Sequence, residues 1–206
     1  MRRFLALALL VLPWAAAAQE AAVLPADQSI MLDGEPYQVA RQGEAPPGDL
    51  AVDFVRLEES FERWTRKVGF RRHQLPQLGN DPVRAAMDLG RLARKLYPES
   101  RPSLIATEDK AEAILDFLAR PPGGGLEFNV VRYARSLDGR AVVSLMFVHR
   151  FPEGADKEAP ERLRDLRRSW VQQAVAIDMG VVQAAMRNEG APAGRPPENG
   201  ARRKTP

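Results

Sequence analysis

Cysteine is absent from this chain of 206 residues, and its absence excludes three kinds of chemistry. Neither a disulfide nor a thiolate metal site can form, and no lipobox cysteine can carry a lipid anchor. Histidine is scarce too, occurring only at His73 and His149. Histidine is the side chain that most readily exchanges protons near neutral pH, so the inventory for acid–base catalysis is small.

Long apolar runs are also scarce, and the clearest one lies at the N-terminus. Two arginines precede an apolar run from 4 to 14, and alanines follow at 15–18. This three-part order is typical of a secretory signal peptide and predicts cleavage after Ala18. A membrane anchor is the alternative, but the run is well short of the roughly 20 residues that span a bilayer. We therefore expect a soluble periplasmic or secreted protein with no transmembrane segment after cleavage.

The body of the chain has no large excess of one charge sign, although the sequence pI is about 9.5. The chain has 30 basic and 27 acidic residues, and signal cleavage removes two arginines. The tail at 190–206 has four basic residues and one acid, which leaves a body of about −2. Sequence-independent nucleic-acid binding needs a dense cationic footprint. The sequence therefore predicts no nucleic-acid partner.

Composition divides the mature chain into three parts. Residues 19–28 carry no pattern and are expected to form a flexible N-terminus. Residues 29–189 have the length of one domain. The basic tail at 190–206 is rich in proline and glycine. Such a segment cannot bury a core, and we expect it to be disordered.

The clearest pattern is an alternation over 126–151 that reverses at Asp138–Gly139. Asp-Gly favours a two-residue type I′ turn, in which both central residues have positive φ. The resulting register places Phe128 opposite His149. One face of the hairpin is then apolar apart from Arg132 and His149. The other face is mixed, and we expect it to be half covered.

Shorter strands are predicted outside this hairpin. The stretch 57–72 fits a helical and a strand period equally. We divide it into a helical turn at 58–62 and a strand at 63–73. The other predicted strands form a hairpin over 29–40 and lie at 50–56 and 103–107.

Three helices are predicted from apolar positions that recur every three or four residues. The first, 82–97, begins with an N-cap acid followed by proline. The second, 108–120, places Glu112 and Asp116 on a solvated face. The third, 160–187, is long and amphipathic, and we expect it to pack on the apolar face of the hairpin.

These elements predict one α+β domain, a mainly antiparallel sheet around the hairpin 126–151 packed by about three helices. Their order resembles that of cystatin-like or PsbP/Mog1-like sheet domains. A fold resemblance of this kind implies no activity.

His149 is the first of the weak catalytic candidates. It lies on the core face, so the favoured interpretation is a buried neutral imidazole with one hydrogen-bonded partner. The alternative is a general base in a hydrolase or isomerase whose site also uses Arg132 and Tyr133. Glu127 points to the opposite face and is expected to pair with Arg150 instead.

No motif for a metal or a cofactor is present. A metal site would require His73 and His149 to meet with a carboxylate, and no local spacing supports this. The glycines at 123–125 lack the Lys-Ser/Thr of a phosphate loop. We therefore expect neither a metal nor a cofactor.

One lead for ligand binding comes from the strand predicted at 63–73. Arg63, Lys67 and Arg71 lie on one side, and His73 ends the strand. Such a cationic band would suit an anionic envelope component or an acidic protein surface. The favoured interpretation is a charged edge strand, because cations on an edge resist edge-to-edge aggregation.

Export and the missing catalytic motifs together predict a non-catalytic binding or interaction module for an envelope component or a protein partner. One alternative is the hydrolase or isomerase around His149. Another is a periplasmic assembly factor or chaperone, which predicts an exposed apolar patch of several hundred Å². The sequence leaves the oligomeric state open.

Overall fold

The computed structural model describes most of the predicted domain. The described residues are 29–32, 34–45, 49–122, 125–152, 154 and 159–186. The predicted signal peptide, the N-terminus at 19–28 and the tail at 190–206 lie outside them.

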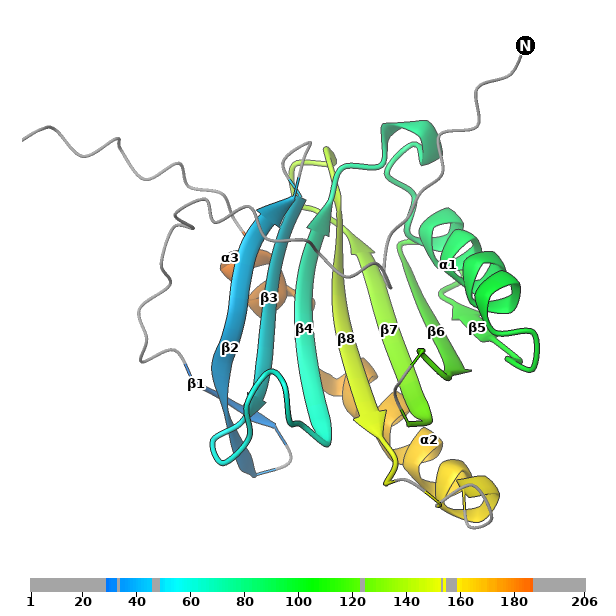
Figure 1. Cartoon of the computed structure of the whole chain (residues 1–206). Helices are drawn as coiled ribbons and strands as arrows, with labels where there is room; N and C mark the ends of the chain where they lie inside the picture. The colour runs from blue at the N-terminus through cyan, green and yellow to red at the C-terminus, as the bar shows by residue number, and fades with distance from the viewer. Residues whose placement is uncertain are drawn as a thin grey trace, which may run out of the picture.

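Eight antiparallel strands form one open sheet in the order β1-β2-β3-β4-β8-β7-β6-β5 (Figure 1). The chain therefore makes two four-stranded meanders, whose last strands, β4 and β8, pair with each other at the centre. The strands are β1 (Ser29–Leu32), β2 (Glu35–Ala45), β3 (Asp49–Arg56), β4 (Arg66–His73), β5 (Ser103–Ala106), β6 (Glu112–Ala119), β7 (Glu127–Arg135) and β8 (Val142–Arg150).

Helices cover the two faces of the sheet unequally. On one face α1 (Pro82–Leu96) packs on β5, β6 and β7, and on the other α2 (Ala159–Ala176) and α3 (Met179–Ala185) pack on β7 and β8. We call these the α1 face and the α2 face. Each face has its own cluster of buried apolar side chains. A 3-10 turn, η1 (Pro76–Leu78), precedes α1. The predicted class, an antiparallel sheet with helices packed on it, is confirmed.

The register predicted for the central hairpin is confirmed, with Phe128 opposite His149. The predicted type I′ turn is wrong, because Gly139 has a φ of 68° but Asp138 does not have positive φ. A wider loop closes through the Ser136 N–H, which donates to Ala141 O at 3.0 Å. Asp138 Oδ1 accepts from the Ser136 hydroxyl at 2.6 Å. A side-chain hydrogen bond thus stabilises this loop, in place of the two-residue type I′ turn that we expected.

The helix predicted at 108–120 is wrong, because this stretch forms β6. The strand lies between β5 and β7 and is covered on both faces. Ala113, Leu115 and Phe117 belong to the core of the α1 face, whereas Ile114 belongs to that of the α2 face. A strand that is buried on both faces has a nearly continuous apolar sequence, in which helical spacings also occur.

The predicted helical turn at 58–62 is also wrong, since these residues form bends and turns, and the strand that follows begins at Arg66. The proposed edge position of this strand is a further error. β4 pairs with β3 on one side and with β8 on the other, so it is a central strand. Its cations therefore do not protect an edge.

The long helix predicted at 160–187 is divided into α2 and α3. Asp178 begins α3, and its side chain accepts from Gly180 N at 2.8 Å. The Arg132 guanidinium donates to Ala174 O at 2.6 Å and to Ile177 O at 2.7 Å. A cation at the C-terminal end of a helix stabilises it, because the cation interacts with carbonyl groups that have no partner within the helix. Arg132 thus ends α2 and attaches it to β7.

Apolar contacts complete this attachment. Trp170 of α2 packs on Phe147 of β8, with ring centroids 5.5 Å apart, and on Phe128 of β7 at 6.4 Å. Arg167 reaches the buried carboxylate of Asp116 at 3.0 Å. The prediction that the last long helix packs on the apolar face of the hairpin is confirmed.

Arg132 also forms an ion pair with Glu112 at 2.6 Å. We expect Arg132→Met to lower the free energy of unfolding by about 3 kcal/mol, because removal of the buried guanidinium leaves the carbonyls at the end of α2 and the Glu112 carboxylate without their partner. Urea denaturation measures this loss. The matched control is Arg91→Met, since Arg91 is exposed and, among the described residues, its ion pair is with Asp88 of the same helix. The control should change stability by less than about 0.5 kcal/mol. Equal losses in the two variants would contradict the role of Arg132.

Candidate functional site

The cations of β4 lie on both faces of the sheet. Lys67, Arg71 and His73 point to the α1 face, and Arg66 points to the α2 face. Arg63 is exposed and precedes the strand. The structure thus places three of the four residues of the predicted band on one face of β4, with Lys67 and His73 toward opposite ends, and leaves Arg63 outside it.

Two of the three basic side chains on the α1 face have carboxylate partners from β3. Arg71 forms an ion pair with Asp53, and its Nη1 also donates to Val52 O at 2.9 Å. His73 Nδ1 lies 3.2 Å from Asp49 Oδ2. The predicted band is therefore largely neutralised by the neighbouring strand.

Gly69 makes room for the Arg71 side chain. A Cβ atom at Gly69 would lie 2.9 Å from Arg71 Nη1 and 3.1 Å from Met146 Cε. Real Cβ atoms essentially never approach other atoms below 3.0 Å. The missing side chain therefore lets the guanidinium lie close to the strand, where it reaches Asp53.

Lys67 differs from the other two basic side chains because it has no carboxylate partner among the described residues. Its Nζ lies 4.6 Å from the centroid of the Trp64 ring and 5.7 Å from that of Phe61. No carboxylate of the described residues lies within ion-pair distance of it. Burial lowers the pKa of Lys67, and the positive charge of Arg71 lowers it further, while the charge of Asp53 opposes the shift.

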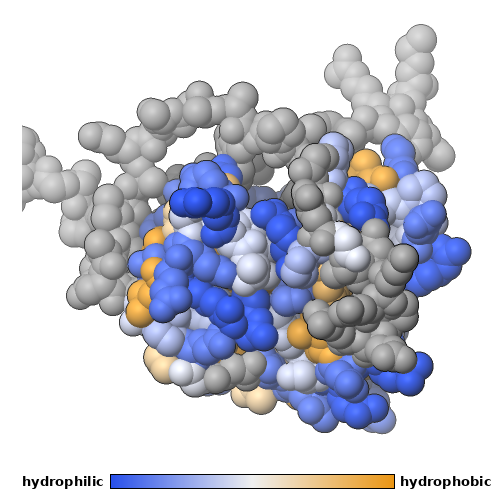
Figure 2. Space-filling view, turned by 60° about the horizontal axis from the view of Figure 1, so that its bottom comes forward, coloured by the Kyte–Doolittle hydropathy of each residue, from blue (hydrophilic) through white to orange (hydrophobic). Residues whose placement is uncertain are grey.

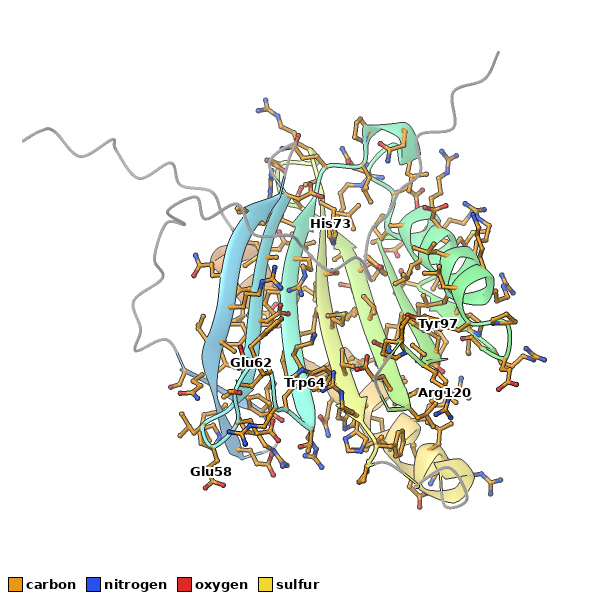
Figure 3. The ribbon with its side chains drawn as sticks, in the orientation of Figure 1. Glu58, Glu62, Trp64, His73, Tyr97 and Arg120 are labelled. Carbon is orange, nitrogen blue, oxygen red and sulfur yellow. The ribbon has the colours of Figure 1, made fainter. Side chains whose placement is uncertain are left out.

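The rings beside Lys67 also contact two arginines. Arg150 lies over Trp64, with 3.9 Å between its Cζ and the ring centroid, and Arg41 lies over Phe61 at 5.0 Å. Cations and aromatic rings attract each other in this arrangement. We call Arg41, Phe61, Lys67, Trp64 and Arg150 the Lys67 stack. It lies at the end of β4 opposite to His73 (Figure 3). No helix of the described residues covers this part of the α1 face.

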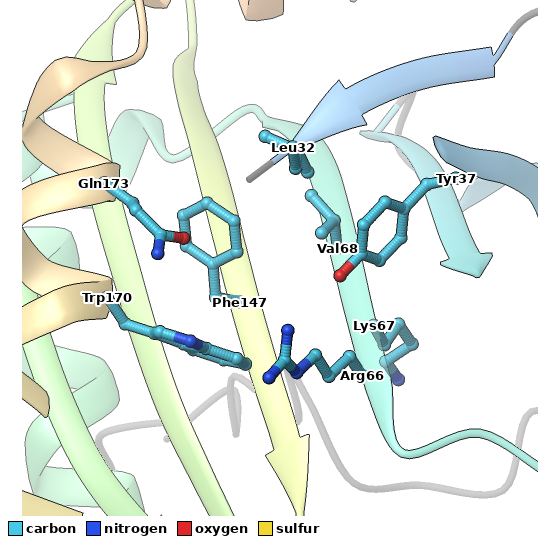
Figure 4. A pocket seen from close by; sticks show the side chains of 8 residues that line it. All are labelled: Leu32, Tyr37, Arg66, Lys67, Val68, Phe147, Trp170 and Gln173. Carbon is cyan, nitrogen blue, oxygen red and sulfur yellow. The ribbon is translucent and has the colours of Figure 1, made fainter. Parts of the chain in front are cut away.

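The α2 face carries a small pocket at the same end of β4. It lies between the β1–β2 hairpin, β4 and α2 (Figure 4) and has room for about one water molecule. Its polar lining comes from Tyr37, Arg66 and Gln173. Glu35 neutralises much of this region, since it accepts two hydrogen bonds from Arg56, at 2.7 and 2.8 Å, and lies 3.5 Å from Arg66.

His149 lies opposite Arg66, beside this pocket. Its ring makes edge contacts with Phe151 and Trp170, at centroid distances of 4.8 and 5.8 Å. Burial, aided by the charges of Arg66 and Arg56, lowers the pKa of His149 to about 4. The imidazole is therefore neutral at pH 7, as the favoured interpretation expects. Its Nδ1 is buried and has no hydrogen-bond partner among the described residues.

The weak catalytic candidates do not meet. Arg132 lies opposite Leu145, about 13 Å along β8 from His149 at 3.3 Å per residue. Tyr133 belongs to the core of the α1 face, and burial raises the pKa of its hydroxyl. Neither Asp nor Glu of the described residues accepts from His149 Nδ1. The geometry does not assemble the acid–base group that a hydrolase or isomerase would need.

The described part of the chain offers no metal site and no membrane span. No three metal-ligating side chains cluster there, and His73 of β4 and His149 of β8 lie on opposite faces at opposite ends of the ladder that joins these two strands. None of its helices combines the length and the apolar character that crossing a bilayer requires.

Comparisons with protein-family models, with curated proteins and with solved structures find no match. Function is therefore inferred from the side chains of this chain alone.

Sequence reasoning missed the two sets of partners that decide the charge of the α1 face. The sequence did carry a signal for the two carboxylates. Asp49 and Asp53 lie on one side of the strand period of β3, and the buried Val52 and Phe54 lie on the other. The rings of Phe61 and Trp64 left no such signal, because they reach β4 from an irregular segment.

We expect the stability of the protein to fall by about 2 kcal/mol as pH drops from about 6.5 toward 4, because of His149 alone. The unfolded chain takes up the proton at about pH 6.5, whereas the folded pKa is about 4, so acid favours unfolding. The size is discounted for partial exposure of the ring.

Urea unfolding of wild type and His149→Phe at pH 7 and pH 4.5 isolates this contribution, because the carboxylates affect both proteins equally. Stability should fall less in the variant. Identical losses would show that the ring titrates normally in the folded state.

Proposed function

We propose that the chain is exported and acts in the periplasm as a non-catalytic binding module. It recognises an anionic group of an envelope component or of a protein partner, and it does so at the Lys67 stack. The N-terminal pattern of two arginines, an apolar run and alanines supports export.

The observation that carries the binding proposal is the environment of Lys67. A cation taken out of water is costly unless a counter-charge accompanies it. Lys67 has two aromatic rings near its ammonium group but no carboxylate of the described residues at ion-pair distance. An anion bound there would supply the missing charge and would reverse the lowering of the pKa.

The surroundings of Lys67 favour an anion over a neutral ligand. The two carboxylates whose charges act on Lys67 are already engaged, because Asp53 pairs with Arg71 and Glu127 accepts from Arg150 at 2.9 Å. Each of these two ion pairs is neutral overall, so neither offsets the charge of Lys67, and neither leaves a free carboxylate to compete with an anionic ligand.

The rival functions receive less support. The hydrolase or isomerase would need a carboxylate at His149, and the chaperone would need a large apolar patch. Figure 2 shows a mainly hydrophilic surface at one end of the sheet, with small separate hydrophobic patches among the described residues. The exposed large apolar side chains belong to many elements: Met31, Leu57, Met87, Leu96, Leu104, Ile105, Leu137, Val175 and Val181.

The likeness to cystatin-like or PsbP/Mog1-like domains stays a prediction about the fold. It adds nothing to the proposed function, because domains of one fold carry many unrelated functions.

Binding is tested on protein purified from the periplasmic fraction of cells that express the full chain. Mass spectrometry should show a mature chain that begins at Gln19. The probes are purified lipopolysaccharide and vesicles that contain phosphatidylglycerol, with phosphatidylcholine vesicles as the neutral comparison. A chain that stays uncleaved in the cytoplasm would contradict the export proposal.

We expect Lys67→Met to weaken binding to the anionic probes by about tenfold, the usual loss for one charge-assisted contact. Arg72→Met is the matched control, because Arg72 lies on the opposite face of β4 and pairs with Asp138. This control should bind like wild type. Equal binding by wild type and Lys67→Met, or a wild type that ignores both anionic probes, would contradict the proposal.

A further inference from the structure

The sheet has a free edge at β5, and its side chains there are unusually apolar. Leu104 is 39% exposed and Ile105 is 53% exposed. A free edge strand offers unpaired backbone groups to another chain, and proteins normally cover such an edge with charged side chains. None of the four residues of β5 is charged.

The hydrogen bonds of β5 show which of its backbone groups point outward. The Thr107 N–H donates to Glu112 O of β6 at 3.1 Å. Residues of an antiparallel strand alternate between facing their partner and facing away from it. Ile105 and Ser103 therefore face β6, and Leu104 and Ala106 present N–H and C=O groups to solvent.

We propose that β5 is the interface of a homodimer, in which β5 of one copy pairs antiparallel with β5 of a second copy across a two-fold axis at Ile105. Such an interface is self-complementary and closes after two copies. Its ladder joins the two sheets into one. The dimer proposal does not rest on the Lys67 stack, which lies at one end of the central strand β4 and not at the β5 edge.

The alternation of outward-facing residues, the missing N–H of Pro102 and the turn at Glu108 together select one register. The outward residues, Leu104 and Ala106, must face outward residues of the second copy. A register that places Leu104 opposite itself would put Ala106 opposite Pro102, which has no N–H to donate. A register that places Ala106 opposite itself would put Leu104 opposite Glu108, which lies in a turn. The register with Leu104 opposite Ala106 satisfies all four outward groups.

Charge complementarity supports the same register. It places the two Ile105 side chains directly opposite each other, where an antiparallel pair brings side chains closest. It also brings Arg101, which precedes β5, beside the turn of the second copy that carries Asp109. Arg101 donates to the carbonyls of Pro98 and Ser100, and Asp109 accepts from Ala111 N. Neither forms an ion pair with a described residue, so both charges are available across the axis.

The features that protect an edge are compatible with this pairing. β5 has only four residues and follows Pro102, and both features limit pairing with other chains. In the selected register Pro102 lies beyond the four paired residues. It therefore restricts the length of the ladder and disfavours an open-ended assembly.

Sedimentation velocity of the mature protein over a range of concentrations tests the interface. Wild type should be a dimer. Ile105→Lys places two like charges opposite each other on the axis, and we expect it to weaken the dimer at least about tenfold. The matched control is Val181→Lys, since Val181 is an apolar residue of α3 with 56% exposure. It should dimerise like wild type.

A charge exchange tests the register. Arg101→Asp and Asp109→Arg should each weaken the dimer, and the double variant should restore it, because every pair is then again of opposite sign. A wild type that stays monomeric, a dimer that survives Ile105→Lys, or a double variant that fails to regain the strength lost in the single variants would overturn the proposal.

Discussion

The pairing of β4 with β8 is the constraint on which the rest of this structure depends. A continuous antiparallel ladder runs from Arg66 opposite His149 to His73 opposite Val142 and joins the two meanders. It places a strand with several cations at the centre of an eight-stranded sheet, where charges need partners. Asp49 and Asp53 of β3 and the rings beside Lys67 are those partners, so the electrostatics of the α1 face follow from this pairing.

The same ladder organises the α2 face. It aligns the aromatic side chains of the hairpin beneath α2, where Phe147 and Trp170 meet. The buried guanidinium of Arg132 then ends that helix and permits α3 to turn back over β8. His149 occupies the margin of this core and is kept neutral by burial. The α2 face is thus packed beneath α2 and α3, and the α1 face holds the candidate binding site beside its own apolar core.

Local patterns sufficed to predict the elements whose determinants are local. The alternation around Asp138–Gly139 predicted the hairpin register, and the proline after Asp81 predicted the start of α1. Three other features depend on contacts made across the fold. The sequence of β6 resembles that of a helix because the strand is buried on both faces. The sequence of β4 resembles that of an edge strand because its partner β8 is distant in sequence. The rings beside Lys67 come from an irregular segment, which has no pattern to predict their position. The candidate site was therefore predicted only in part: the cations were named, but not which one lacks a carboxylate.

The most direct test of the account is a pH titration of the Lys67 ammonium group by NMR, read from the carbon and proton signals next to its nitrogen. We predict a pKa below the ordinary lysine value of about 10.4 and a rise in this pKa when the anionic probe is added. A Lys67 that titrates like the exposed lysines, with or without the probe, would contradict it.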